Sequence, residues 1–408
     1  MKIQKDRQDR QVAGLKKWQM AGYRGSLRWC TGSGKTYAAI LAIKHLKRKK
    51  ADLFTVVAVP SDNLRTQWRE QLEYHRLDKV YVDTVHTLVK SNIECDFFIL
   101  DEIHSYTGGP IFSTLFDCVS RTYTLGLTAR EREKPEDQAV LDIHAPIIDI
   151  LDLREALKNS WISEFQVYNL GVDLTASDRR LYDKMHTEFI KYFSTFDFDF
   201  KLAMACLNNQ NLRDDVSRRM RMPIKVVNAH VFQFNRIMQR RKKFLYNSEA
   251  VFNCARDIIF NFPEKKIITF SETTDMADRL TEAIPESRAY HSNLKTTVID
   301  GKKFGARRLR IRYLAEFKDD TIRVLNSARA LNEGTDIPSV DMSIKTSFTS
   351  TVLDSIQRLG RTLRKFGDKQ ATEINIYVKN TQSEKWLKKS QRETPNVSWI
   401  NSISEINA

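Results

Sequence analysis

The chain has 408 residues, of which 41% are hydrophobic and 29% charged, a length that favours two or three domains with well-formed cores. Only 14 glycines and 9 prolines are present, which argues against disorder and against a fibrous repeat. The sequence contains no run of about 18 apolar residues. The first residues are polar. We therefore expect neither a transmembrane helix nor a secretory signal.

The formal net charge is +15, of which residues 1–150 carry +4 and residues 151–408 carry +11. Such an excess favours a polyanionic partner, either nucleic acid or an anionic surface. The five cysteines are scattered and never spaced C-x-x-C, which argues against a disulfide framework and a zinc ribbon. We expect reduced thiols in a cytoplasmic protein, with a nuclear location left open.

Two parts of the chain alternate short apolar runs with amphipathic stretches, which is typical of doubly wound parallel sheets. In the first part, strands are expected at 53–60, 79–85, 96–102 and 121–128, with helices at 35–50 and 63–77. In the second part, strands are expected at 265–272, 321–328, 342–347 and 372–379, with helices at 275–284 and 353–366.

The middle of the chain lacks this alternation. Residues 151–172 read as a connector that could already contribute a strand, and 175–260 read as mainly helical, with Thr175 or Ser177 as a helix cap. The predicted fold is α/β, with a helical insertion between two lobes or early in the second. We divide it into lobe 1 (1–150), a connector with a basic helical insertion (151–260), and lobe 2 (261–408).

The strongest motif is T-G-S-G-K-T, formed by Thr31, Gly32, Ser33, Gly34, Lys35 and Thr36. Glycines let backbone N–H groups surround phosphate oxygens at a helix N-terminus. Lys35 would place its charge at the β and γ phosphates of ATP, and the Thr36 hydroxyl would ligate Mg²⁺. Position 29 is Trp, so the full G-x-x-x-x-G-K-T pattern is not met.

A second motif, D-E-I-H, ends the apolar run 96–102, and Asp101 stands 66 residues after Lys35. A strand tip beside a phosphate loop is where a metal contact and a water-activating base are needed. Asp101 suits the metal, and Glu102 suits polarising the attacking water. Without its context, this motif would more often be a solvated turn.

With five further segments in the same order, these two motifs resemble those of the superfamily 2 helicases and translocases. The segments are P-S-D-N-L-R-T-Q-W (60–68), T-V-H-T-L (84–88), L-T-A (127–129), N-E-G-T-D-I-P (332–338) and Q-R-L-G-R-T-L-R (357–364). The resemblance covers nearly the whole chain. It implies two RecA-like lobes that close on ATP and Mg²⁺ and move on nucleic acid.

The last segment would bring cations to the ATP cleft. Arg361 and Arg364 stand at i and i+3 on one helix face, with Gln357 a turn earlier. Guanidinium groups can neutralise the transferring γ-phosphate. The resemblance assigns both arginines to this role, with Arg364 the better candidate; alone, the segment would read as a solvated basic helix.

Two further nucleotide contacts follow from the resemblance. The family places an adenine-reading Gln some two dozen residues before the phosphate-loop lysine, and we choose Gln11 over Gln8. Asp336 is expected to touch either the ribose or the arginines of the 357–364 segment. The usual Arg and aromatic neighbours of the adenine-reading residue are absent around Gln11.

The resemblance also implies contacts with the sugar-phosphate backbone, which fix position without reading bases. They are expected at Pro60, Ser61, Thr84 and Thr335, and the 270–271 pair is a weaker candidate. Trp68 is expected to pack its helix onto the sheet rather than stack on a base.

Two features of the insertion remain open. Phe189, Tyr192, Phe193, Phe196 and Phe200 recur at helical spacing, either as a helix core or as a wedge for separated bases. The basic run that includes Arg240 and Arg241 is either a solvated face or a phosphate contact.

The favoured function is an ATP-dependent DNA helicase or translocase that acts on single-stranded, forked or branched DNA. The compact motif set resembles the XPB-like and phage branch-migration group more than the large RNA helicases. An RNA helicase, a duplex translocase without strand separation, and a passive binding module are the alternatives. A monomer without a membrane partner is expected.

Overall fold

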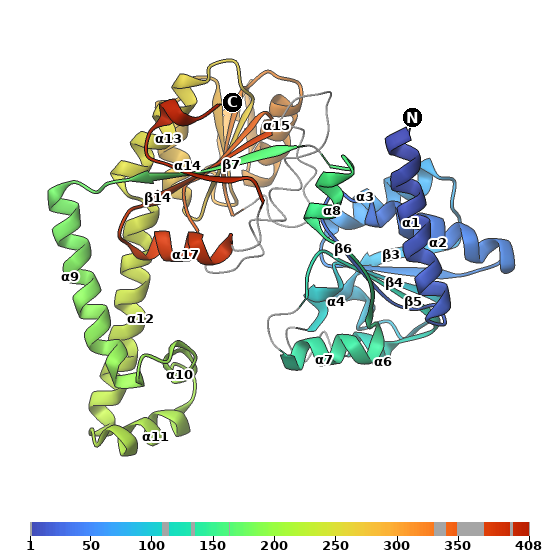
Figure 1. Cartoon of the computed structure of the whole chain (residues 1–408), viewed down its shortest axis with the longest axis horizontal. Coiled ribbons are helices and arrows are strands. Elements are labelled where there is room, and N and C mark those ends of the chain that lie inside the picture. The colour runs from blue at the N-terminus through green and yellow to red at the C-terminus, as the bar shows by residue number, and fades with distance from the viewer. Residues whose placement is uncertain are drawn as a thin grey trace.

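The computed structural model describes residues 2–107, 114–131, 135–162, 164–329, 340–348, 371–391 and 395–407. Two α/β lobes lie side by side, and a helical arm projects from the second (Figure 1). Among these residues, no helix is long and apolar enough to cross a membrane.

The described part of lobe 1 contains a six-stranded parallel sheet in the order β3-β2-β4-β5-β1-β6. The four expected strands are confirmed as β2 to β5, and the structure adds β1 inside the sheet and β6 at its edge. Their bounds are β1 Arg24–Trp29, β2 Thr55–Val59, β3 Val80–Thr84, β4 Ile93–Asp101, β5 Val119–Thr128 and β6 Ile147–Leu151.

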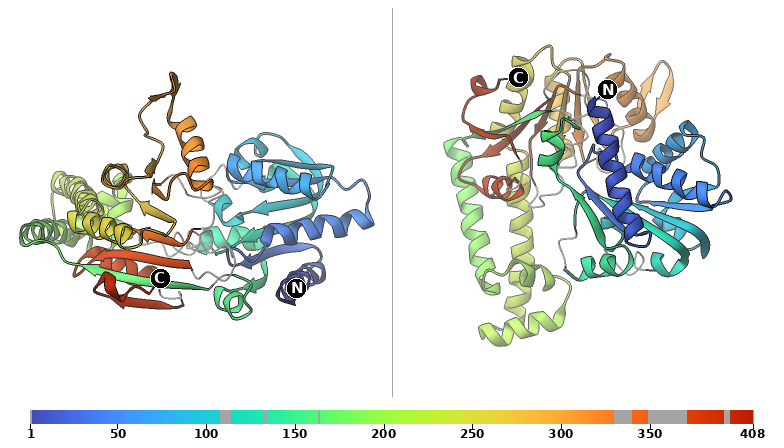
Figure 2. Two further views of the ribbon diagram at one scale, coloured as in Figure 1. Left: turned by 90° about the horizontal axis from the view of Figure 1, so that it is seen from above. Right: turned by 45° about the vertical axis from the view of Figure 1, so that its right-hand side comes forward.

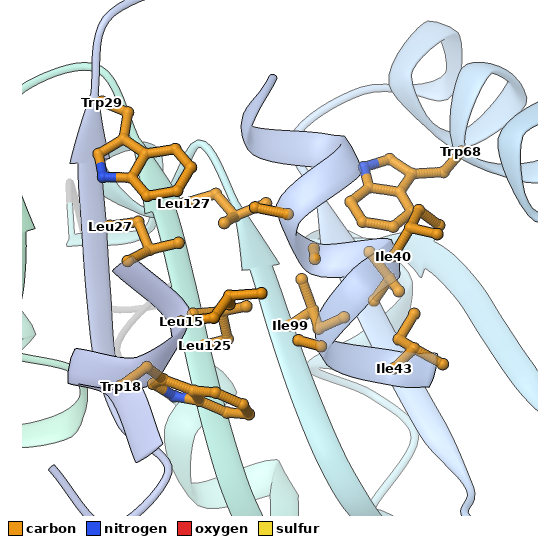
Figure 3. Packing of buried hydrophobic residues seen from close by; sticks show 14 of the residues in the cluster. Leu15, Trp18, Leu27, Trp29, Ile40, Ile43, Trp68, Ile99, Leu125 and Leu127 are labelled. Atoms are coloured by element: carbon orange, nitrogen blue, oxygen red, sulfur yellow. The ribbon is translucent and has the colours of Figure 1, made fainter. Parts of the chain in front are cut away.

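Helices cover both faces of this sheet, as a doubly wound fold requires. The first face carries α1 (Lys2–Met20), α2 (Lys35–Lys49), α3 (Asp62–Tyr74) and α8 (Leu153–Lys158), whose apolar side chains form the larger core. Figure 3 shows Trp18, Ile40 and Trp68 meeting strand residues in that core. The second face carries α4 (Val85–Leu88), η1 (Ile103–Thr107), α6 (Leu115–Cys118) and α7 (Pro135–His144).

Lobe 2 contains, in its described residues, a seven-stranded parallel sheet in the order β15-β7-β14-β13-β8-β12-β9. Strand β7 lies at Phe165–Val172, inside the range expected to be a connector, and pairs with β14 over its whole length. The second sheet therefore begins well before residue 261. The other strands are β8 Ile267–Ser271, β9 Ser287–Tyr290, β12 Val324–Ala328, β13 Met342–Lys345, β14 Ala371–Val378 and β15 Val397–Ile400.

Helices α13 (Glu249–Asn261) and α14 (Thr274–Ala283) pack on one face of the second sheet, and α15 (Ala306–Lys318) and α17 (Gln382–Ser390) on the other. A small antiparallel hairpin, β10 (Thr297–Ile299) with β11 (Lys302–Phe304), protrudes before α15 (Figure 2). A short 3-10 turn, η3 (Ile403–Glu405), follows β15. Phe165 and Val167 pack against α8, which joins the lobes.

The arm leaves the second sheet directly after β7. Thr175 caps its first helix by accepting a hydrogen bond from Asp178 N, which confirms one of the two expected caps. Helices α9 (Ala176–Phe193) and α12 (Ile224–Tyr246) form the stem, and η2 (Ser194–Phe196), α10 (Phe200–Ala205) and α11 (Gln210–Met220) form the tip (Figure 1). The helical insertion thus lies early in lobe 2, because α13 returns to the sheet of that lobe.

Candidate functional site

The expected residues of lobe 1 gather at one edge of its sheet. Because all six strands are parallel, their carboxyl ends meet there. Trp29 ends β1 just before the phosphate loop, Asp101 ends β4, and Thr128 ends β5. Pro60 follows β2 and Thr84 ends β3 at the same edge. This is the edge at which doubly wound sheets bind ligands.

The phosphate loop has the backbone that its glycines allow. Gly32 and Gly34 have φ of +82° and +91°, in the region where a side chain is strained. Gly34 caps α2 and offers no side chain, so the first N–H groups of the helix face outward as an anion site. Ser33 is buried, and its hydroxyl donates to Cys30 O at 2.7 Å.

Gln11 lies against this loop. Its amide Nε2 donates to Ser33 O at 3.0 Å, and the residue is only 4% exposed. Arg7, one helical turn earlier on α1, donates to Ser33 O at 3.2 Å and also to Gly32 O. Arg7 was not predicted from the sequence, although its i, i+4 spacing to Gln11 places both on one face of α1. Whether Gln11 reads adenine stays a prediction.

Trp29 is a structural residue that explains the departure from the usual motif. It is buried, and its Nε1 donates to Asp149 Oδ2 at 2.8 Å. Arg10 and Lys17 of α1 also contact the Asp149 carboxylate, each at 2.6 Å. Nearby, Lys35 Nζ donates to the Trp29 carbonyl at 3.0 Å. This network fixes α1, and with it Gln11, beside the phosphate loop.

Asp101 is a buried carboxylate that forms no ion pair within 4 Å among the described residues, although the charge of Lys35 acts on it from nearby. Trp68 Nε1 donates to its Oδ2 at 2.8 Å, and the backbone N–H of Glu102 donates to its Oδ1 at 3.1 Å. Burial and the neighbouring Glu102 raise the pKa of Asp101 to about 6, although the Trp68 bond opposes this rise. A carboxylate whose direct hydrogen-bond donors among the described residues are neutral suits a metal ligand.

Glu102 and His104 connect the tip of β4 to that of β5. Glu102 has φ of +51°, a strained backbone for a non-glycine residue. His104 is fully buried, with Nδ1 2.9 Å from Thr128 Oγ1 and 3.5 Å from Glu102 Oε2. Thr128 also donates to the Arg130 carbonyl at 2.8 Å. A shift at Glu102 would therefore reach the 127–129 segment through His104.

Ser61 and Thr84 cap helices at the sheet edge. The hydroxyl of Ser61 accepts from Leu64 N at 3.5 Å and starts α3, and Pro60 beside it is half-buried. Thr84 precedes α4, and its hydroxyl lies 3.2 Å from that of Thr87. Their contacts with nucleic acid stay predictions. The other expected residues, Thr335, Asp336, Gln357, Arg361 and Arg364, lie outside the described residues.

The two arginines of the arm that are expected to contact nucleic acid differ in their exposure to solvent. Arg240 is exposed on α12, whereas Arg241 is 5% exposed and its guanidinium lies 4.1 Å from the centre of the Phe189 ring. The expectation that Arg241 contacts nucleic acid is wrong, because α9 packs over this face of α12. Burial also lowers the pKa of Arg241.

The aromatic series of the arm is mainly a helix core. Phe196 is fully buried with Phe234, and Phe189, Tyr192 and Phe193 pack partly buried against the same cluster. Of the five, Phe200 is half exposed. A position in the helix core, rather than a wedge for separated bases, is therefore the better description of Phe196.

Two family models match the chain: the type III restriction enzyme res subunit over residues 4–92 and the helicase conserved C-terminal domain over residues 250–366. The DNA 3'-5' translocase XPB2 of Sulfurisphaera tokodaii is 27% identical over 393 residues, covering 91% of this chain and 82% of that protein.

Solved helicase structures share the fold. The Pyrococcus furiosus Hef helicase domain matches with a TM-score of 0.55 at 15% identity, covering 92% of this chain and 96% of that one. S. cerevisiae Dbp5 bound to RNA and ADP BeF3 matches with a TM-score of 0.59 at 15% identity, covering 96% and 88%. The two family models and the XPB2 relative, together with the motif order and the two parallel sheets, indicate a superfamily 2 helicase or translocase, which is a nucleic-acid-dependent ATPase.

Proposed function

We propose that this protein is an ATP-driven DNA motor that moves along DNA and unwinds or remodels forked or branched DNA. The observation that carries the proposal is the meeting of the phosphate loop, the Asp101–Glu102 pair and the strand ends at Ser61 and Thr84 on one sheet edge. The net charge of +15 supports a polyanionic partner. The similar archaeal protein is named a DNA 3'-5' translocase, which favours DNA.

ATP would bind with its phosphates in the 31–36 loop, where Lys35 and the first N–H groups of α2 compensate their charge. The donor set fits Mg²⁺: Thr36 offers a hydroxyl, and Asp101 offers a carboxylate that no cation of the described residues binds. Mg²⁺ would neutralise charge on the phosphate oxygens. Gln11 would contact the adenine from α1.

Glu102 would polarise the attacking water. Arg361 and Arg364, with Gln357, would approach the γ-phosphate from lobe 2, where Arg364 is the better candidate for the finger. Asp336 would contact the ribose or these arginines. Closing the cleft in this way couples the ATP state to the distance between the lobes.

The nucleic acid would lie across the strand ends of both lobes. Pro60, Ser61, Thr84 and Thr335 would hold sugar and phosphate, and Arg240 would add a contact from the arm. Alternating grips of two lobes give directed stepping. Because one chain supplies both lobes, we expect a monomer to suffice, which sedimentation during turnover can test.

Steady-state ATP hydrolysis at fixed salt tests the proposal, with no polymer, single-stranded DNA, duplex, forked or four-way DNA, and RNA. Stimulation by DNA, and most by branched DNA, is expected. Stimulation by RNA alone would favour an RNA helicase. Strand-displacement and triplex-displacement assays then separate a helicase from a duplex translocase that does not part strands.

Three variants test the assigned residues in that assay. Lys35→Ala is expected to impair ATP use, and Glu102→Gln to bind ATP but turn it over poorly. Arg364→Ala should lose hydrolysis more than nucleotide binding. Lys90→Ala is a matched control, since Lys90 is an exposed lysine of the same lobe and belongs to none of the seven motif segments. Normal turnover in Glu102→Gln would contradict its role as the base.

A further inference from the structure

A pocket of about 430 Å³ opens at the root of the arm, where α9 and α12 meet the start of α13. Arg240 and Lys243 of α12 line it, as do Asp178 of α9 and the Ser248–Glu249 pair at the start of α13. The root of the arm lies against the second sheet, as Figure 1 shows. Apart from Arg240, none of the residues assigned above to ATP or nucleic acid lines this pocket.

Ser248 is the unusual residue of the pocket. It occupies the N-cap position of α13, a helix of 13 residues, yet its hydroxyl caps no backbone N–H. The residue is 5% exposed, and its Oγ has no hydrogen-bond partner within the part of the chain that the structure describes. Buried hydroxyls nearly always have a partner. Ser248 lines the pocket while its Oγ is buried, so a rotation about χ1 would be needed to offer this hydroxyl to a ligand.

Two cations face the same space. Arg240 and Lys243 stand at i and i+3 on α12, so they lie on one side of the helix. Neither makes a hydrogen bond or an ion pair with another of the described residues. The N-terminus of α13 adds the positive end of a helix dipole. A tetrahedral anion satisfies all three features at once.

The acidic residues of the pocket do not cancel this charge. The Glu249 carboxylate is paired with Arg279 of α14. Asp178 remains as one negative charge against Arg240, Lys243 and the helix end. The pocket therefore favours an anion held on the side away from Asp178.

The pocket also lies near the carboxyl ends of the second sheet. Tyr246, at the end of α12, donates to Phe348 O just after β13, at 2.7 Å. Thr273, two residues after β8, donates to the amide oxygen of Asn247. Both contacts hold the pocket beside the edge at which the proposed motor would carry nucleic acid.

We propose that this pocket binds a phosphate group, supplied by the backbone of the nucleic acid on which the motor is loaded. The inference rests on the proposed function for its source of phosphate, and on Ser248, Arg240 and Lys243 for its chemistry. It makes the root of the arm a grip that is independent of the strand ends in lobe 1.

The test is the salt dependence of binding to a labelled DNA fork, measured by fluorescence anisotropy. Arg240→Gln with Lys243→Gln should lower the affinity about tenfold and make the slope of log K against log salt less steep by about 2, since each cation that neutralises phosphate contributes about one. Arg236→Gln with Lys225→Gln removes the same charge from exposed sites of α12 outside the pocket and should change the slope less.

Ser248→Ala separates a ligand contact from a structural role. A hydroxyl without a partner contributes nothing to folding, so the Tm should stay or rise while DNA affinity falls several-fold. A lower Tm with unchanged affinity would overturn this part of the proposal. Equal slopes in the pocket and control variants would overturn the whole of it.

Two further measurements show which part of the proposal is wrong if the expected results are not obtained. If inorganic phosphate raises the Tm of the wild type but not of the Arg240–Lys243 variant, while both bind DNA equally, the pocket takes free phosphate and the DNA source is wrong. If the wild-type ATPase responds to DNA but the slopes do not differ, only the pocket proposal fails. If DNA binds without stimulating ATP hydrolysis, the proposed function fails, and the slopes still decide the pocket.

Discussion

Trp68 Nε1 donates a hydrogen bond to Asp101 Oδ2 at 2.8 Å, and both side chains are buried. Trp68 lies on α3, which begins at Ser61, a proposed contact for nucleic acid. One helix therefore connects a proposed nucleic-acid contact with the proposed metal ligand. A movement of α3 would change the environment of the carboxylate on which ATP use depends.

The first prediction concerns Trp68→Phe and the pH dependence of ATP hydrolysis. Burial and Glu102 raise the pKa of Asp101 to about 6, and the indole N–H lowers it by stabilising the ionised form. Removing that N–H raises the pKa further. The acid limb of kcat/KM for ATP, which reports groups of the free enzyme, should move to higher pH.

Trp18→Phe is the matched control. Trp18 is equally buried in lobe 1, and its Nε1 donates to Thr124 O at 2.8 Å, away from any carboxylate. The Trp18→Phe variant loses a similar hydrogen bond. Its stability should therefore fall by a similar amount, while the acid limb of its kcat/KM profile stays at the same pH. Identical pH profiles for the wild type and Trp68→Phe would show that the indole does not tune Asp101.

The second prediction is that Asp101→Asn stabilises the protein while it abolishes ATP hydrolysis. Because burial raises the pKa of Asp101 from its ordinary value of 3.8 to about 6, ionised Asp101 destabilises the folded state above pH 6. The cost is about 1–3 kcal/mol at neutral pH. The amide oxygen can still accept from Trp68, which removes the cost of the buried charge, while the amide NH2 faces the Glu102 N–H and offsets part of that gain.

Thermal unfolding at two pH values checks this. The Tm of Asp101→Asn should exceed that of the wild type at pH 7.5, and the gap should close as the pH falls through 6 toward 4, where the wild-type carboxyl is protonated. A lower Tm at pH 7.5 would mean that the ionised carboxylate makes favourable contacts that outweigh its burial.

The position of the candidate residues of lobe 1 at one sheet edge could be predicted from the sequence, whereas their roles stay predictions. Asp101 ends an apolar run that predicts a buried strand, and the T-G-S-G-K-T motif places Lys35 at a strand-to-helix turn; parallel strands bring their carboxyl ends together. The network around Asp149 that fixes α1 beside the phosphate loop was not predictable in this way. Arg10 and Asp149 are 139 residues apart, and nothing local indicates that they meet.

The arm shows what sequence could not decide. Arg240 and Arg241 are neighbours in one basic run, yet one is exposed and the other stacks on Phe189. A helix turns by about 100° per residue, so adjacent residues face different ways. Which of them is buried depends on where α9 packs, and that is a tertiary contact.

The third prediction concerns Gly34→Ala. Gly34 has φ of +91°, and a Cβ there would overlap the Nε2 of Gln11. The substitution should displace Gln11 and raise KM for ATP about tenfold or more, because the loop loses both its conformation and its support. Gly22→Ala is the control: its φ is +70°, but a Cβ there meets nothing within 4 Å.

Both glycine variants carry the strain of a positive φ, so their difference reports what the substitution does within the phosphate loop, through its conformation and the overlap with Gln11. Equilibrium binding of a fluorescent ATP analogue measures it. Gly22→Ala should lower the Tm slightly and bind nucleotide normally. If Gly34→Ala also bound nucleotide normally, neither the loop conformation nor Gln11 would matter for binding.

The fourth prediction separates Phe196 from Phe200, which the sequence pattern joins. Phe196 is fully buried, so Phe196→Leu should cost about 1–2 kcal/mol by leaving space in the core of the arm. Phe200 is 50% exposed, with its ring at the edge of Phe234, so Phe200→Leu should change stability by less than about 0.5 kcal/mol.

Only Phe200 can therefore test a role for the arm in separating bases. If its ring stacks on an unpaired base, Phe200→Leu should keep the DNA-stimulated ATPase and slow strand displacement. Phe232→Leu is the control, because Phe232 is 65% exposed on the same arm and outside the buried cluster. Equal strand displacement by Phe200→Leu, Phe232→Leu and the wild type would show that the arm does not use an aromatic wedge at this position.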